Sequence, residues 1–135
     1  MRKAMSNQAT VLRSKYCQCY ILDDKHEAVP ERNIEHWSIW MAASKHMRIV
    51  GQITFNNGLY LSTVFLGMNH NFTDKGTPIL FETMLFLNGK SLYQMRHSTW
   101  KQAEGEFYRL KGLITSARGP GLLNRVIALV REGVK

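Results

Sequence analysis

Two β-rich segments decide the fold of this chain: LYLSTVFLG at Leu59–Gly67 and ILFETMLF at Ile79–Phe86. Both are dominated by aliphatic, aromatic and β-branched residues, which is the composition typical of strands. Successive side chains of a strand point to opposite faces of its sheet, and in both segments each set is substantially apolar. We therefore predict a β-hairpin with helices on both faces, or with one apolar face left open for a partner.

Asn-Gly pairs flank these two segments. Asn56-Asn57-Gly58 follows a β-rich run at Met47–Phe55, and Asn88-Gly89 precedes a short run at Lys90–Arg96. An Asn-Gly pair is the strongest short hairpin signal, because both residues accept positive φ. Four strands joined in this way predict an antiparallel meander.

A helical pattern precedes the strands. Ile34, Trp37 and Met41 recur at helical spacing after Pro30, which is tolerated at the first position of a helix. We predict a helix from about Glu31 to Ser44. The two tryptophans at 37 and 40 have the aromatic surface needed to stack on bases, but their spacing favours a place in the core.

Helices also follow the strands. Thr99 and Gln102 have the spacing of a capping box, in which each side chain accepts a backbone N–H of the other's turn. The apolar stripe of the same helix comprises Trp100, Ala103, Phe107, Leu110 and Ile114. Gly119-Pro120-Gly121 ends this helix, and Leu122–Val130 predicts a last helical segment.

The expected fold class is therefore α+β: an antiparallel meander of four or five strands with one helix before it and two after it. The fifth strand is Tyr16–Leu22, which we expect at an edge of the same sheet. A chain of 135 residues has room for one domain. Within it we expect a basic arm at 1–15, a core at 16–115 and a C-terminal helical tail at 116–135.

The net charge of +8 is unevenly distributed along the sequence. Residues 1–15 carry four basic side chains and no acid, and residues 90–135 carry nine basic and three acidic ones. The part between them, 16–89, carries five basic and seven acidic side chains. A positive surface attracts nucleic acid and acidic partners. The basic residues that we predict to contact nucleic acid or a partner are Arg2, Lys3, Arg13, Lys15, Arg109, Lys111, Arg118, Arg125 and Arg131.

Cysteine usage and hydropathy indicate a protein of a reducing compartment. Cys17 and Cys19 lie two apart in a predicted strand, where a disulfide between them would be strained. We therefore expect a cytoplasmic location. No apolar run approaches the roughly 18 residues of a membrane span, so we expect no membrane association. Cys-x-Cys with the scattered His36 and His46 lacks the paired spacing of zinc motifs, and no cofactor-binding motif occurs, so we predict neither a metal nor a cofactor.

The loop at Met68–Gly76 is the best candidate for a catalytic site. It carries His70 and Asp74, and His70 has the chemistry of a general base near neutral pH. Glu82 is the one charged residue of an apolar strand, and a buried carboxyl is a catalytic candidate. A dyad of His70 and Glu82 is the enzymatic hypothesis. The alternative is that the loop residues serve turn geometry and that Glu82 faces solvent or pairs with a basic side chain.

Several of these segments resemble a family of small uncharacterised proteins of tailed bacteriophages. The residues that carry the resemblance are Leu61–Gly67, His70, Phe72, Pro78–Phe86, Thr99-Trp100 and Ala103. It spans roughly residues 21–108 and implies a phage or prophage gene expressed in a bacterial cytoplasm, without implying an activity. Asn69 stands where the family tends to have Asp before the histidine, so a role for that Asp does not carry over.

Three functions remain open at this point. The first is a small non-enzymatic phage accessory protein that binds and modulates a host protein or nucleoprotein complex, such as a counter-defence inhibitor of the anti-CRISPR kind. The lack of a catalytic motif and the uneven charge favour it. The second is an accessory protein that binds DNA or RNA through the basic residues, and the third is a small hydrolase-type enzyme using His70 and Glu82. A two-faced apolar sheet also fits a homodimer.

Overall fold

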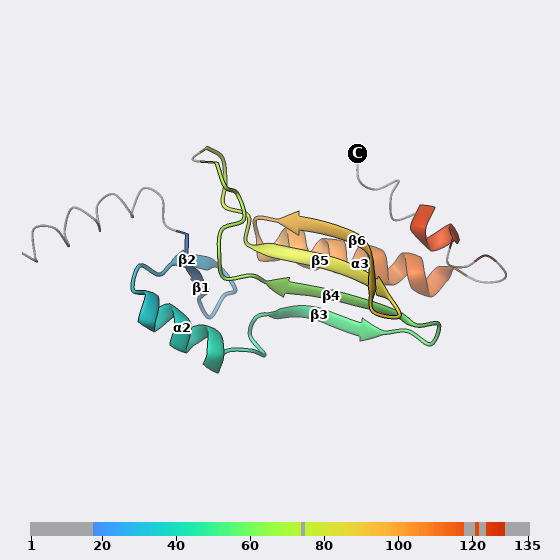
Figure 1. Ribbon diagram of the computed structural model, residues 1–135, viewed down its shortest axis with the longest axis horizontal. Coiled ribbons are helices and arrows are strands. Elements are labelled where there is room, and N and C mark those ends of the chain that lie inside the picture. Colours follow the sequence, from blue (N-terminus) through green and yellow to red (C-terminus); the bar gives the residue numbers. More distant parts are fainter. Residues whose placement is uncertain (1–17, 74, 118–120, 122–123, 129–135) are drawn as a thin grey trace, which may run out of the picture.

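The computed structural model describes residues 18–73, 75–117, 121 and 124–128 of the chain (Figure 1). The elements in chain order are β1 (Tyr20–Leu22), β2 (Ala28–Pro30), α2 (Ile34–Ala43), β3 (Ile49–Thr54), β4 (Leu59–Phe65), β5 (Phe81–Leu87), β6 (Lys90–His97) and α3 (Trp100–Ser116). Residues 124–128 are also helical. The predicted α+β class is confirmed, with one helix before the main sheet and helical segments after it.

Strands β3 to β6 form the predicted antiparallel meander, in the order β3-β4-β5-β6. The turn between β5 and β6 has the expected geometry, because Asn88 and Gly89 both take positive φ, at 49° and 85°. The turn between β3 and β4 differs from the expectation. There Gly58 takes a φ of 86°, whereas Asn57 does not take a positive φ.

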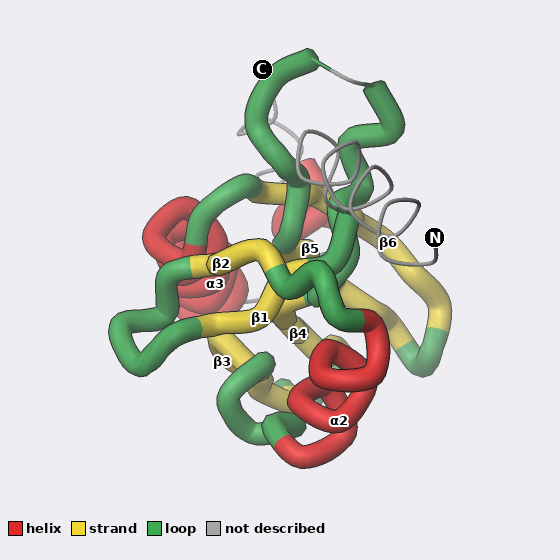
Figure 2. Tube along the Cα trace, turned by 90° about the vertical axis from the view of Figure 1, so that its left-hand side faces the viewer, coloured by secondary structure: helices red, strands yellow, loops and turns green. Residues whose placement is uncertain are grey.

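The prediction that the first strand joins the main sheet is wrong. β1 pairs antiparallel with β2 in a separate two-stranded sheet. Just before β1, Cys19 forms an isolated bridge with Met68, and Leu22 of β1 packs in a buried cluster with Phe65 and Phe81. Figure 2 shows β1, β2 and α2 grouped at one end of the four-stranded sheet. The β2 partner has only three residues and ends in Pro30, so it carried no recognisable strand pattern.

Helix α2 begins three residues later than predicted, and Pro30 is not its first residue. Asn33 is the N-cap, and its side chain accepts the N–H of His36 at 3.0 Å. No residue of α2 is buried, and Ile34, expected in its core stripe, is 62% exposed. The helix packs against the end of the sheet instead of across its face, held by Trp37. The indole N–H of Trp37 donates to the carbonyls of Tyr20 at 3.1 Å and Gly67 at 2.9 Å.

Helix α3 covers one face of the main sheet (Figure 1). The capping box of Thr99 and Gln102 is confirmed. The buried positions of the helix are Ala103, Glu106, Phe107, Leu110 and Ile114. They pack against the inward side chains of β4 and β5, such as Leu61 and Leu85, which are fully buried. Within the described residues, no helix is both long and apolar enough to span a lipid bilayer.

Candidate functional site

The face of the main sheet opposite α3 has no described helix or strand on it (Figure 1). We call this surface the open face. Its inner part consists of Tyr60, Ser62 and Val64 from β4 and Glu82, Met84 and Phe86 from β5, all partly exposed. They alternate with residues that are buried under α3. The sequence left two arrangements open, and the described residues have the one in which no helix covers this apolar face.

Two aromatic rings lie next to each other on the open face. Tyr60 and Phe86 are register partners on the two inner strands β4 and β5. Their ring centroids are 6.0 Å apart and their planes are inclined by 27°. Ser62 and Met84 form the next cross-strand pair, so a flat aromatic surface continues into a thioether. Sequence analysis missed this pair, because Tyr60 and Phe86 are 26 positions apart and only the register brings them together.

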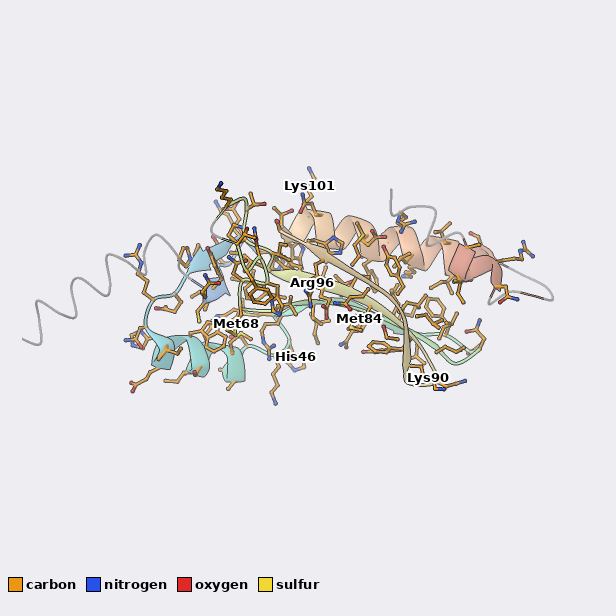
Figure 3. The ribbon with its side chains drawn as sticks, turned by 45° about the horizontal axis from the view of Figure 1, so that its top comes forward. His46, Met68, Met84, Lys90, Arg96 and Lys101 are labelled. Carbon is orange, nitrogen blue, oxygen red and sulfur yellow. The ribbon has the colours of Figure 1, made fainter. Side chains whose placement is uncertain are left out.

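Polar side chains border this aromatic pair. Glu82 accepts hydrogen bonds at Oε2 from Nε2 of Gln94 at 2.7 Å and from Nε of Arg96 at 3.0 Å. On the same face, at the β3 edge, Nε2 of Gln52 donates to Oγ of Ser62 at 3.5 Å. Figure 3 shows Met84 and Arg96 on this surface. The carboxylate of Glu82 is therefore occupied by a basic partner, the alternative that the sequence left open.

The loop that carries His70 is organised by asparagine side chains. Oδ1 of Asn69 accepts the N–H groups of Asn71 at 2.8 Å and Ile79 at 2.9 Å. Nδ1 of His70 lies 2.9 Å from the carbonyl oxygen of Met68. His70 is therefore paired with the backbone of Met68, whereas Glu82 is paired with the side chains of Gln94 and Arg96. The catalytic dyad stays a prediction, and Asp74 lies outside the described residues.

Few of the basic residues predicted to form an interface fall within the described part of the chain. Arg109, Lys111 and Arg125 are described, and Arg2, Lys3, Arg13, Lys15, Arg118 and Arg131 lie outside it. Arg109 is bound to the carboxylate of Glu106, at 2.7 Å from Nε and 2.6 Å from Nη2. Nζ of Lys111 lies 5.8 Å above the centre of the Tyr108 ring. Both side chains belong to α3 and so lie on the side away from the open face.

A buried polar network lies between β4, β5, β6 and α3. Oγ1 of Thr83 is 2.8 Å from Oγ1 of Thr63 and 3.0 Å from Nε2 of His97. His97 is 7% exposed, and burial lowers its pKa below the ordinary value of 6.5, while Glu106 acts in the opposite direction. Burial, with the charge of Glu106, raises the pKa of Tyr93 above 10, and Arg109 opposes this. The network borders a cleft of about 690 Å³.

Sequence analysis missed this network, although one signal was present. Glu106 lies beside Phe107 within the apolar stripe of α3, where an acid is expected only if it has a partner. Arg109, one turn along, is that partner. Arg109 partners the carboxylate of Glu106, and Thr63, Thr83 and His97 partner one another, as buried polar groups of a structural network do. Among the described residues, no three His, Cys, Asp or Glu side chains are placed to hold a metal ion.

Comparison with known proteins adds nothing to these observations. No protein-family model, no curated protein and no solved structure matches the chain. The candidate sites therefore stand on their geometry and chemistry alone.

Proposed function

We propose that this chain binds single-stranded nucleic acid on its open face. The observation that carries the proposal is the pair of partly exposed rings, Tyr60 and Phe86, on the two inner strands of an uncovered antiparallel sheet. Aromatic side chains on such a sheet stack against bases that have been freed from a duplex. Stacking tolerates any base, because every base has a π-face.

The surroundings of the two rings suit an extended strand. Met84 and Val64 continue the apolar surface along β5 and β4, with room for further bases. Gln52 and Gln94 stand on the outer strands, and an amide group both donates to and accepts from base edges. A duplex would not use the stacking surface, because its bases are already stacked on one another.

The charge of the chain also supports an anionic polymer as the partner. The net charge is +8. Glu82 is the one acid among the open-face residues, and Arg96 neutralises it at 3.0 Å. Lys90 is exposed at the start of β6, directly after the Asn88-Gly89 turn, and its register partner is Leu87, the residue that follows Phe86. Cationic side chains near a stacking platform bind phosphates and steer the strand towards it.

Fluorescence anisotropy with a labelled single-stranded oligonucleotide at low salt tests the proposal. The double variant Tyr60→Ala/Phe86→Ala should bind more weakly, because each lost stacking contact is worth about 1–3 kcal/mol. The matched control is Tyr108→Ala, which removes an aromatic ring that is 60% exposed on α3. It should bind like the unaltered chain. Circular dichroism of each variant checks that the fold is retained.

Three outcomes would contradict this function. The first is that the unaltered chain shows no binding at low salt. The second is that the double variant binds as tightly as the Tyr108→Ala control. The third is a preference for duplex over single strand of the same length.

A second function rests on the exposed side chains of α2. Ile34 is 62% and Ile39 67% exposed, and apolar side chains of this kind on one helix fit a protein partner. For this second function we propose a phage accessory protein that binds and modulates a host machine. A counter-defence inhibitor is one such protein, and its location would be the bacterial cytoplasm. A homodimer also stays a prediction, which light scattering tests.

Co-purification from nuclease-treated bacterial lysate tests this second function. A host protein recovered in stoichiometric amount with the unaltered chain should be lost with Ile34→Ser/Ile39→Ser. Nuclease treatment removes partners held only through nucleic acid. Equal recovery with the unaltered chain and the variant argues against α2 as the contact.

A further inference from the structure

A pocket of about 520 Å³ lies between the β1–β2 turn, the segment that leads into β5, and the first turn of α3. Its volume is in the range of pockets that hold small ligands. Its floor is apolar and includes Tyr20, Pro78, Leu80 and Phe81. The pocket is separate from the open face. Phe81 is buried on the side of the sheet that α3 covers, whereas Tyr60 and Phe86 lie on the open face.

One wall of the pocket is a stacked pair of rings. The His26 imidazole lies parallel to the Trp100 indole, with 3.9 Å between ring centroids and 9° between planes. Trp100 packs edge to face with Phe81, with 6.2 Å between the ring centroids. Its Nε1 also donates a hydrogen bond to Oε2 of Glu104 at 3.4 Å. The pocket therefore has a rigid aromatic wall above an apolar floor.

His26 lies in a turn whose backbone conformation favours glycine over histidine. Oδ1 of Asp23 accepts the N–H groups of Lys25 and Glu27, both at 2.9 Å, which fixes a tight turn. In that turn His26 has a φ of 63°, a conformation that glycine adopts without cost. Glycine would satisfy the backbone, so the reason for a side chain here is the ring that faces Trp100.

The rim of the pocket is cationic. Lys25 comes from the turn and Lys101 from the first turn of α3, and Figure 3 shows Lys101 projecting from the helix. No acidic residue occupies that first turn, so the positive end of the helix is not neutralised from within it. Ser98 and Thr99 add hydroxyl groups. Glu27 is the acid that faces the pocket, against two lysines.

We infer that this pocket binds a small anion that carries a planar ring, of the chemical class of nucleoside monophosphates. The ring lies on the apolar floor beside the His26–Trp100 wall, and the phosphate lies at the rim with Lys25 and Lys101. The inference does not depend on the open face, because no residue is shared between the two sites.

Titration of the full chain with three probes tests the inference: adenosine monophosphate, adenosine and inorganic phosphate. The readout is the NMR shift of the Trp100 indole N–H, assigned by its loss in Trp100→Phe. Adenosine monophosphate should give a saturable shift, and each of the other two probes should bind at least about tenfold more weakly. Lys25→Ala/Lys101→Ala should weaken binding of the monophosphate by a similar factor, whereas Lys45→Ala, in the turn that follows α2 and outside the pocket, should leave it unchanged.

Two further variants keep the test decisive. His26→Gly suits the backbone of the turn and removes only the ring, so it should fold and bind more weakly. Tyr60→Ala/Phe86→Ala should bind the monophosphate unchanged, which separates this pocket from the open face. The inference is overturned by no saturable shift of Trp100, by equal binding of inorganic phosphate or adenosine, or by unchanged binding in the double lysine variant.

Discussion

The ring of Phe107 lies directly against Gly51: a Cβ atom on Gly51 would be 2.6 Å from Cε2 of that ring. This contact packs α3 against β3, and it requires a residue without a side chain. Gly51→Ala should therefore lower the free energy of unfolding by about 1–3 kcal/mol through overpacking. Urea denaturation measures it. An unchanged midpoint would mean that α3 shifts freely on the sheet.

Gly105→Ala is the matched opposite of that change. Gly105 lies in the middle of α3, and a Cβ there would meet no other atom within 4 Å. Glycine is less favourable than alanine inside a helix by roughly 1 kcal/mol. The variant should therefore be more stable by about that amount in the same urea titration. A loss of stability would show that the exposed side of α3 is covered by something.

The buried imidazole of His97 should make stability depend on pH. Because its pKa is lowered in the folded state, the unfolded chain binds the proton more readily. The free energy of unfolding should therefore fall as the pH drops below about 6.5, until the lowered pKa of the folded state is reached. His97→Gln should remove this part of the pH dependence. An identical slope between pH 7 and 5 in the variant would assign it to other groups.

Trp37 should control the local stability of the end of the molecule that contains β1, β2 and α2. Trp37→Phe removes a donor from the carbonyls of Tyr20 and Gly67, at a cost of about 1–3 kcal/mol. Because α2 has no buried residue, the loss should open this end before the main sheet. Hydrogen exchange should quicken in α2 and β1 and stay slow in β4. Uniform quickening would mean that the two parts unfold together.

Salt dependence separates the open face from the basic residues predicted in the sequence. If phosphates pass the end of the open face at the β5–β6 turn, Lys90→Gln should reduce the slope of log affinity against log salt by about 0.7 for a single strand. Lys111→Gln, on α3 behind the sheet, should leave the slope unchanged. The reverse result would favour the surface of α3 as the route of the nucleic acid.

The parts of the fold that follow local rules could be predicted from the sequence. The composition of β4 and β5 predicts strands, and Asn88-Gly89 predicts the turn after them. The capping box and the apolar stripe predict α3. Each of these signals lies within a few residues of the structure that it forms. The pairing of Leu61 with Leu85 follows from them, since a meander pairs each strand with its neighbour.

The parts that depend on long-range packing could not be predicted. β2 exists because β1 pairs with it, and three residues ending in Pro30 give no strand pattern of their own. Ile34 fits an apolar stripe, yet it is exposed because α2 meets the sheet at its end. The Tyr60–Phe86 pair and the His26–Trp100 pair needed the register and the fold before their rings met.

The meander also bears on how the chain reaches its native state. Each hydrogen-bonded neighbour in the order β3-β4-β5-β6 is also the next strand along the chain, and the β3–β4 and β5–β6 pairings close short loops. Short loops lower the entropic barrier to the transition state, and such topologies reach it sooner than sheets with crossovers. β1 must wait, because the bridge of the neighbouring Cys19 with Met68 joins residues that are further apart in the chain than any partners within the meander. We therefore expect the sheet and α3 to form the folding nucleus, with the β1–β2 end added last.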